Sequence, residues 1–293
     1  MFKWAQIGDL QMPYQDDRAV ALWFKIMRKY KPDAIDIVGD IDDFLEFSSY
    51  SDGTTDEFFN QLSMEEKDFG KSMAVATKAY DSLTEQADRE AFEWPEKPTL
   101  NPVPYVMQVS KGAREFYTKI SEDHPDADKF SALGNHDIRV FNYIDKKAPL
   151  FKPQITPDSP WDFKNLGIGY SMYEEPPVER FGGFHVHHGT TTSDTGPAVQ
   201  KDIEKFQINL IRGHDHRGGV FYRNYPMANR ELTGVATGHM CDPKAYGLKY
   251  TINHSWQLGF STVEIDEMGN AFPEFHKITP DYTCNFRGRL FKG

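Results

Sequence analysis

Apolar residues near the N-terminus change from a strand-like to a helical spacing and back. Residues 2–7 form a short apolar-rich run, and residues 17–30 place apolar side chains three or four positions apart, as a helix requires. Lys31-Pro32-Asp33 ends that helical pattern, and a second apolar run follows at residues 34–38. A strand, a helix and a strand of these lengths predict a parallel βαβ unit.

The segment from about residue 44 to residue 109 interrupts this alternation. Ser63-Met64-Glu65-Glu66 has the capping-box pattern and predicts a helix that ends near residue 92. Several prolines follow and predict a loop: Pro95, Pro98, Pro102 and Pro104. We interpret residues 44–109 as a helical and Pro-rich insertion within a single domain of residues 1–293.

The remainder of the chain returns to alternating elements and then becomes rich in strands. Helical spacing covers residues 110–122, 138–147 and 197–206, and a Pro-rich loop is predicted for residues 149–160. The predicted strands are residues 129–133, 182–187, 208–212, 219–222, 232–237, 257–265 and 272–278. We therefore expect an α/β fold.

Composition narrows the possible classes of protein. The 293 residues include 39% hydrophobic and 26% charged residues, which is typical of a globular protein. A net charge of −11 argues against a broad surface that coats nucleic acid. No apolar run approaches the roughly 18 residues of a membrane span, and Asp9 precedes any signal-peptide core. With two cysteines and no export signal, we predict a cytoplasmic protein that does not bind membranes.

Five short motifs carry potential metal ligands, and each follows a strand-like run. They are Asp9-Leu10-Gln11, Gly39-Asp40-Ile41-Asp42-Asp43, Gly134-Asn135-His136-Asp137, His187-His188-Gly189 and Gly213-His214-Asp215-His216. Because ligands of open α/β sheets bind beyond the carboxyl ends of the strands, these motifs can converge on one site. Carboxylate, amide and imidazole groups together suit Mn²⁺, Fe, Zn²⁺ or Ni²⁺.

The order of the five motifs resembles that of the calcineurin-like metallophosphoesterases. The resemblance covers residues 9–216, and Ser255-Trp256-Gln257-Leu258-Gly259-Phe260 extends it toward small bacterial and phage-encoded members. It implies a four-layer αββα sandwich and a cofactor of two divalent metal ions. We take Mn²⁺ as the first expectation, with Fe, Zn²⁺ or Ni²⁺ as alternatives.

The resemblance also implies a role for each site residue. The implied ligands of the first metal ion are Asp9, Gln11 and His216, those of the second are Asn135, His188 and His214, and Asp40 bridges both. His136 is the implied general acid that protonates the leaving oxygen, and Asp43 orients it and favours its protonated form. Arg139 and Arg217 are candidates for binding phosphate oxygens, although surface ion pairs are an equally good explanation.

Two positions leave alternatives open. On a strand, His185 and His187 alternate with apolar residues and face away from the core, whereas His188 directly precedes Gly189, where the family places a ligand. We favour His188 over His187. Most family members have histidine where this chain has Gln11, and an amide oxygen is a harder and weaker ligand than imidazole. This difference leaves the metal and the substrate class open.

The reaction implied by the resemblance is hydrolysis of a phosphate ester. Two metal ions about 3.5–4 Å apart generate the attacking hydroxide and stabilise both the attacking and the leaving oxygen. Phe44-Leu45 follows Asp43, where protein phosphatases carry Arg-Gly, so we favour a phosphodiesterase acting on nucleotides or nucleic-acid ends. The alternatives are a phosphomonoesterase and a catalytically inactive scaffold of the same fold.

Overall fold

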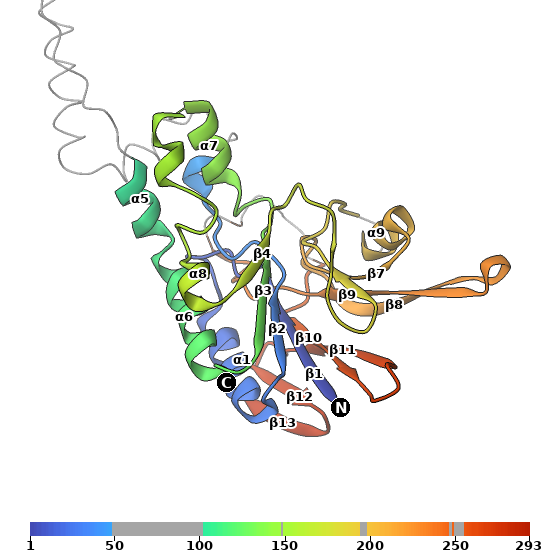
Figure 1. The fold of residues 1–293 in the computed structure, drawn as a ribbon. Helices are drawn as coiled ribbons and strands as arrows, with labels where there is room; N and C mark the ends of the chain where they lie inside the picture. Colours follow the sequence, from blue (N-terminus) through green and yellow to red (C-terminus); the bar gives the residue numbers. More distant parts are fainter. Residues whose placement is uncertain (49–101, 148, 194–197, 246–247, 249–254) are drawn as a thin grey trace, which may run out of the picture.

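Two mixed β-sheets form the centre of the protein (Figure 1). The computed structural model describes residues 1–48, 102–147, 149–193, 198–245, 248 and 255–293. The first sheet has the order β11-β10-β1-β2-β3-β4. Its strands are β1 (Phe2–Ile7), β2 (Ala34–Ile37), β3 (Asp128–Ala132), β4 (Gly169–Ser171), β10 (Gly259–Ile265) and β11 (Ala271–Lys277).

The second sheet has five strands in the order β5-β6-β7-β9-β8. Its strands are β5 (Val178–Glu179), β6 (Phe184–Val186), β7 (Asn209–Arg212), β8 (Gly218–Tyr225) and β9 (Arg230–Thr237). A separate hairpin of β12 (Thr283–Phe286) and β13 (Arg289–Lys292) follows the two sheets in the chain.

Parallel strands occupy the part of each sheet from which the ligand motifs emerge. In the first sheet β1, β2, β3 and β4 pair in parallel, whereas β10 and β11 add antiparallel pairs at one edge. In the second sheet β6, β7 and β9 pair in parallel. The predicted βαβ unit is confirmed, with α1 (Asp17–Tyr30) joining β1 to β2. Parallel pairing directs the carboxyl ends of these strands to the same edge.

The side chains of β1 show how the layers are stacked. Ala5 and Ile7 join the core beneath the helices, which includes Trp23 of α1. Trp4, on the opposite face, joins a second core with Val186 of the other sheet. Since side chains alternate across a strand, one strand contributes to both cores. A third cluster packs α9 (Ala198–Phe206) against the outer face of the second sheet. The predicted layered α/β fold, with two sheets between helices, is confirmed.

Helix α1 begins where a polar side chain accepts its first backbone N–H groups. At the start of α1, the Asp16 carboxylate accepts hydrogen bonds from the backbone N–H groups of Arg18 and Ala19, both at 3.1 Å. Such a cap contributes about 1 kcal/mol to stability. The other described α-helices are α5 (Pro102–Val109), α6 (Lys111–Asp123), α7 (Arg139–Lys147) and α8 (Phe163–Leu166). Figure 1 shows α1 and α6 on the same side of the first sheet.

Several boundaries differ from the predictions. The loop prediction at Pro102 and Pro104 is wrong, because both prolines lie in the first turn of α5, where backbone N–H groups have no partner within the helix. Residues 149–154 of the predicted loop form a 3₁₀ helix, η3 (Pro149–Gln154). Two further 3₁₀ helices are η1 (Leu45–Phe47) and η4 (Pro226–Ala228). The capping box at residues 63–66, its helix and most of the predicted insertion lie outside the described residues.

In the described part of the chain, every helix is too short or too polar to cross a bilayer.

Candidate metal centre

The five ligand motifs lie at the carboxyl ends of β1, β2, β3, β6 and β7. Backbone hydrogen bonds join their loops to one another. The N–H of Asp9 donates to Gly39 O at 2.9 Å, that of Gln11 to Asp40 O at 2.9 Å, and that of Gly213 to His188 O at 3.0 Å. The backbone N–H of His214 donates to Asp9 Oδ1 at 3.1 Å and links the two sheets. Their polar loops therefore lie in one shared region, as the sequence predicts for such motifs.

Asp9, Gln11 and His216 form one group of buried side chains. His216 Nε2 lies 3.1 Å from Gln11 Nε2 and 3.3 Å from Asp9 Oδ1. Their exposed fractions are 0%, 1% and 3%, respectively. These residues are the three that the family resemblance assigns to the first metal ion.

Asp40, His188 and His214 form a second group. The candidate ligand atoms of these three residues all lie within 4.8 Å of one another. His188 Nε2 is 3.1 Å from Asp40 Oδ2 and 3.3 Å from His214 Nδ1. A set of two imidazoles and one carboxylate is suited to a divalent transition metal.

A backbone carbonyl orients His188 toward this group. His188 Nδ1 lies 2.7 Å from Val38 O and donates its proton there, which leaves Nε2 facing Asp40. Partners of this kind commonly fix the ring orientation of metal-binding histidines. The neighbouring His187 differs, because its Nε2 contacts Tyr173 O at 3.0 Å and its Nδ1 accepts from Gly189 N at 2.8 Å. The structure thus brings His188, and not His187, next to Asp40.

The second group contains a buried pair of opposite charges. Burial raises the pKa of Asp40, but His188 and His136 outweigh it and hold that pKa well below its usual range. Burial lowers the pKa of His188, yet Asp40 reverses the effect and raises it to about 9. Burial, followed by His188, lowers the pKa of His214 to about 2, so the His214 ring is neutral at pH 7. A cation at this position would replace the proton of His188 as the partner of Asp40.

The backbone adopts unusual conformations at the candidate ligands. Positive φ angles of 49° to 78° occur at five non-glycine site residues, namely Asp9, Gln11, Asp40, His214 and His216. Left-handed backbone is uncommon for such residues and costs free energy, and it concentrates at functional sites. Glycine relieves crowding nearby, because a Cβ at Gly134 would collide with the Asp40 carboxylate and one at Gly213 with that of Asp9.

Three atoms of the implied metal ligands lack hydrogen-bond partners within the described residues. They are Gln11 Oε1, Asn135 Oδ1 and His216 Nδ1. Buried polar atoms without partners are costly, and an ordered ion or water is a common explanation for them. The donor set and these unpaired atoms fit divalent cations.

His136 lies beside the second group together with Asp43 and Arg139. His136 Nδ1 bonds to Asp43 Oδ1, and its backbone N–H donates to Asp40 Oδ1 at 2.9 Å. Arg139 donates from Nη1 to Asp43 O at 2.7 Å, and its Nη2 lies 3.0 Å from His136 Nε2. Since a guanidinium always carries its protons, Nε2 accepts this bond and the ring proton lies on Nδ1. The structure therefore brings three predicted residues into direct contact.

Arg217 lies in the loop after β7, next to His216, and has a different kind of partner from Arg139. Its Nη2 donates to Ser255 Oγ at 2.7 Å. The next residue, Trp256, packs edge-on against His216 with a centroid separation of 4.0 Å. Trp256 lies within residues 255–260, the C-terminal segment that extends the family resemblance. That segment was the available signal in the sequence, but the predicted site residues do not include Trp256.

Asp137 is a second residue that the sequence analysis did not include. Its Oδ1 accepts from the backbone N–H groups of Ile41 and Asp42, both at 3.0 Å, and its Oδ2 accepts from Gly134 N at 2.8 Å. Burial and then Asp40 raise the pKa of Asp137 to about 7. Asp137 joins the loops after β2 and β3. Asp137 is the last residue of the motif Gly134-Asn135-His136-Asp137, and this position was the sequence signal for its role beside the site.

Comparisons with known proteins give distant relatives. No family model matches the chain. The chain is 22% identical to the Gene 54 proteins of Mycobacterium phages D29 and L5, over 89% of this chain and 88% of each relative. Among solved structures, it is similar to vacuolar protein sorting 29 from Cryptosporidium parvum, with 11% identity, a TM-score of 0.43, and coverage of 99% and 94% of the two chains. A Vps29 single mutant from Entamoeba histolytica gives 10% identity, a TM-score of 0.42, and coverage of 99% and 96%. These likenesses are too weak to assign a function.

Proposed function

We propose that this protein is a metal-dependent phosphoesterase, and that it hydrolyses phosphodiesters of nucleotides or nucleic-acid ends. One observation carries the proposal: two adjacent groups of buried metal-type donors lie beside a histidine–carboxylate pair. The first group is Asp9, Gln11 and His216, the second is Asp40, His188 and His214, and the pair is His136 with Asp43. Asn135 would join the second group through its unpaired Oδ1.

Cations bound at these groups would supply a nucleophile at neutral pH and charge stabilisation for the phosphoryl oxygens. The carboxylates of Asp9 and Asp40 would hold the cations, and the Asp40 carboxylate would contact both. The left-handed backbone at both aspartates keeps these carboxylates directed into the site before any substrate binds. Such preorganisation reduces the reorganisation needed during the reaction.

His136 would transfer a proton to the leaving oxygen. That role needs a proton on Nε2, whereas Arg139 now donates to this nitrogen. A phosphate oxygen is a stronger partner for guanidinium than a neutral imidazole, because it is charged and accepts in a planar, bidentate way. Substrate binding would therefore draw Arg139 to the phosphate and free Nε2 of His136. Nε2 would then take up a proton from water, and the Asp43 carboxylate would stabilise the resulting imidazolium through Nδ1.

The decisive test combines metal content with ester hydrolysis. Metal-stripped protein would receive Mn²⁺, and its metal content would be measured by mass spectrometry. Turnover would then be followed on bis-p-nitrophenyl phosphate and, separately, on p-nitrophenyl phosphate. We expect bound metal and faster turnover of the diester.

Two results would change the proposal. Preference for the monoester would replace the phosphodiesterase by a phosphatase. Folded protein that binds no metal and hydrolyses neither ester would overturn the phosphoesterase and leave a non-catalytic scaffold. The same metal titration with Zn²⁺, Fe²⁺ and Ni²⁺ would identify the preferred ion.

A further inference from the structure

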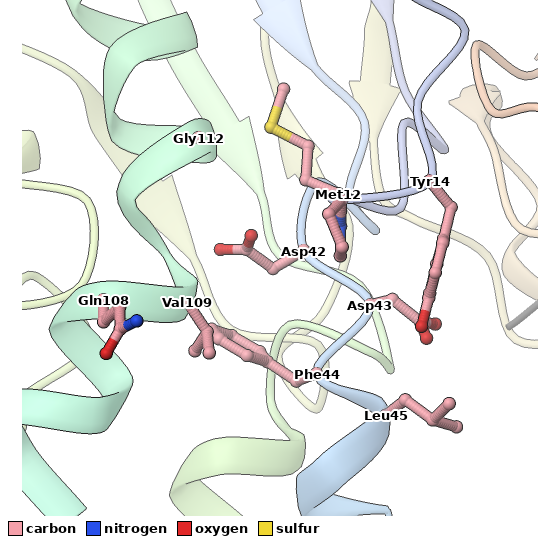
Figure 2. Close-up of a pocket in the computed structure, with 10 residues that line it drawn as sticks. Met12, Tyr14, Asp42, Asp43, Phe44, Leu45, Gln108, Val109 and Gly112 are labelled. Atoms are coloured by element: carbon pink, nitrogen blue, oxygen red, sulfur yellow. The ribbon is translucent and has the colours of Figure 1, made fainter. Parts of the chain in front are cut away.

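A pocket of about 320 Å³ lies beside Asp43, outside the two groups of metal-type donors (Figure 2). Three parts of the chain form its walls. They are the loop after β1 at Met12–Tyr14, the loop after β2 at Asp42–Leu45, and the junction of α5 with α6 at Gln108, Val109 and Gly112. The volume is at the lower end of the range for small-molecule sites, roughly 300–1,000 Å³.

Apolar side chains supply most of the wall. Met12 and Phe44 are buried, and Leu45 and Val109 are partly buried around the same space. Figure 2 shows Phe44 and Val109 close together on one side, with the Tyr14 ring extending toward Asp43 on the other. Such a space favours a flat, largely apolar group over a charged one.

The Asp43 carboxylate lines this pocket, as do the polar side chains of Asp42 and Gln108. The Asp43 side chain is 2% exposed, and Oδ1 already bonds to His136 Nδ1. Oδ2 is buried and has no hydrogen-bond partner among the residues described. An unpaired buried acceptor is costly, so an occupant that donates a hydrogen bond is favoured. Carboxylate and phosphate groups are disfavoured, because they would add a second negative charge beside Asp43.

We propose that this pocket binds the nucleobase of the substrate, with an exocyclic amino group donating to Asp43 Oδ2. This inference rests on the proposed function, since it names the part of a nucleotide ester that lies away from the metal ions. A nucleobase combines a flat apolar ring with N–H donors at its edge, which fits the apolar wall and the unpaired Oδ2 of Asp43. Asp43 would then contact the base through one oxygen and orient His136 through the other.

Direct binding to metal-stripped protein tests the pocket without any hydrolysis. Adenosine and purine riboside differ only by the exocyclic amino group, and each would be titrated by calorimetry. We expect adenosine to bind on the order of tenfold tighter, because a hydrogen bond to a charged acceptor is lost with purine riboside. Equal affinities of the two nucleosides, or no binding of either, would overturn the inference.

Gly112 offers a matched pair of variants. A Cβ added there would have Met12 Sδ as its nearest neighbour at 3.4 Å, which is an ordinary contact, so Gly112→Ala leaves the pocket open. Gly112→Leu extends a side chain toward Met12 and fills part of the space. Both substitutions raise helix propensity in α6 and should fold. We expect Gly112→Leu to weaken adenosine binding about tenfold or more and Gly112→Ala to preserve it. Equal binding by both variants would place the nucleoside elsewhere.

The two proposals can fail separately. Wild-type protein that hydrolyses bis-p-nitrophenyl phosphate but binds no adenosine would remove the base pocket and retain the phosphoesterase. Protein that binds adenosine at this pocket but hydrolyses neither nitrophenyl ester with metal bound would remove the proposed reaction alone.

Discussion

Two buried histidines in different regions of this molecule have different surroundings. His188 lies at the carboxyl end of β6 beside the Asp40 carboxylate, whereas His276 lies in β11 between Phe260 and Phe286. Burial lowers the pKa of both, but Asp40 raises that of His188 to about 9, while that of His276 falls to about 4. Burial alone therefore does not set the pKa of either ring. The buried Asp40 carboxylate close to His188 accounts for the difference between them.

The backbone conformations of the two regions also differ. β10 and β11 pair in continuous antiparallel register from Gly259↔Lys277 to Ile265↔Ala271. His276 uses this regular frame to bond Thr262 Oγ1 at 2.8 Å. The ligand loops instead hold Asp9, Asp40 and His214 in left-handed conformations. Substitutions at the strand ends should therefore change metal binding and turnover, and those in β11 should change stability.

The largest effect is expected from Asp40→Asn. This change removes the negative charge of the Asp40 carboxylate, which faces both His188 and His136. In the proposed site the same carboxylate would contact both cations. Metal-ion stabilisation of a phosphoryl transition state contributes several kcal/mol, so turnover should fall on the order of 10³-fold or more. Metal content and hydrolysis of bis-p-nitrophenyl phosphate would be measured together.

Asp36→Asn is a matched control for that substitution. Like Asp40, Asp36 has a buried carboxylate, but Asp36 lies within β2 and each of its oxygens accepts a hydrogen bond from Arg180 at 3.0 Å. The control should lower the free energy of unfolding and leave metal content unchanged. If Asp40→Asn retained full metal content, Asp40 would not be a ligand.

A smaller loss is expected from His136→Ala. His136 contacts Asp43 and Arg139 through its ring nitrogens, and the proposal gives it the general-acid role. Removal of a general acid costs roughly 10²- to 10⁴-fold in turnover. The loss should be smaller for esters with good leaving groups, which need less protonation, and metal content should stay unchanged. Equal losses on activated and unactivated diesters would remove His136 from this role.

Part of the fold could be predicted from the sequence. Apolar periodicity correctly predicted β1, α1 and β2, because α1 buries one stripe and β1 is covered on both faces. The hairpin of β12 and β13 was not predicted, because each strand has only four residues, and the polar–apolar alternation of β12 is too short to stand out. Propensity also failed at α5, where prolines at the first turn of a helix were interpreted as loop residues.

The candidate site was predictable in its residue types and less so in its geometry. Strand-end motifs correctly placed Asp40, His188 and His214 near one another, because parallel strands direct their carboxyl ends to one edge. No local pattern predicts which of two adjacent histidines receives Val38 O as a partner. The contact of Trp256 with His216 depends on chain segments from different strands, so only the folded structure provides it.

A modest effect on stability is expected from His276 as the pH falls. Burial and then Arg287 lower the pKa of His276 to about 4, so the folded state binds this proton less readily than the unfolded chain. The stabilisation is therefore complete above the unfolded pKa of about 6.5 and is lost as the pH falls toward 4. Between pH 7 and pH 5 the loss should be about 2 kcal/mol.

His276→Gln isolates this contribution, because a glutamine does not titrate. Urea denaturation of wild-type and variant protein at both pH values gives the difference. The variant should lose less stability than the wild type over this interval, by about 2 kcal/mol. An identical loss in both proteins would show that other groups account for the acid sensitivity.

The smallest effect is expected from Gln11→His. Gln11 faces His216 Nε2 at 3.1 Å, and its Oε1 has no hydrogen-bond partner in the described part of the chain. An imidazole at this position is a softer and stronger ligand than an amide oxygen, so it should favour Zn²⁺ over Mn²⁺. We expect metal affinity to increase about tenfold, or about 1.4 kcal/mol, with the larger gain for Zn²⁺.

Chelator competition with each ion would measure the change, and Gln15→His is a matched control. Gln15 follows Gln11 by four residues but bonds to Asp17 at 2.9 Å, away from the metal-type donors. A new imidazole there should leave both affinities as they are. If Gln11→His changes neither affinity nor preference, then Gln11 is not a direct ligand. The first group would then depend on Asp9 and His216, and the metal specificity would have to originate in the second group.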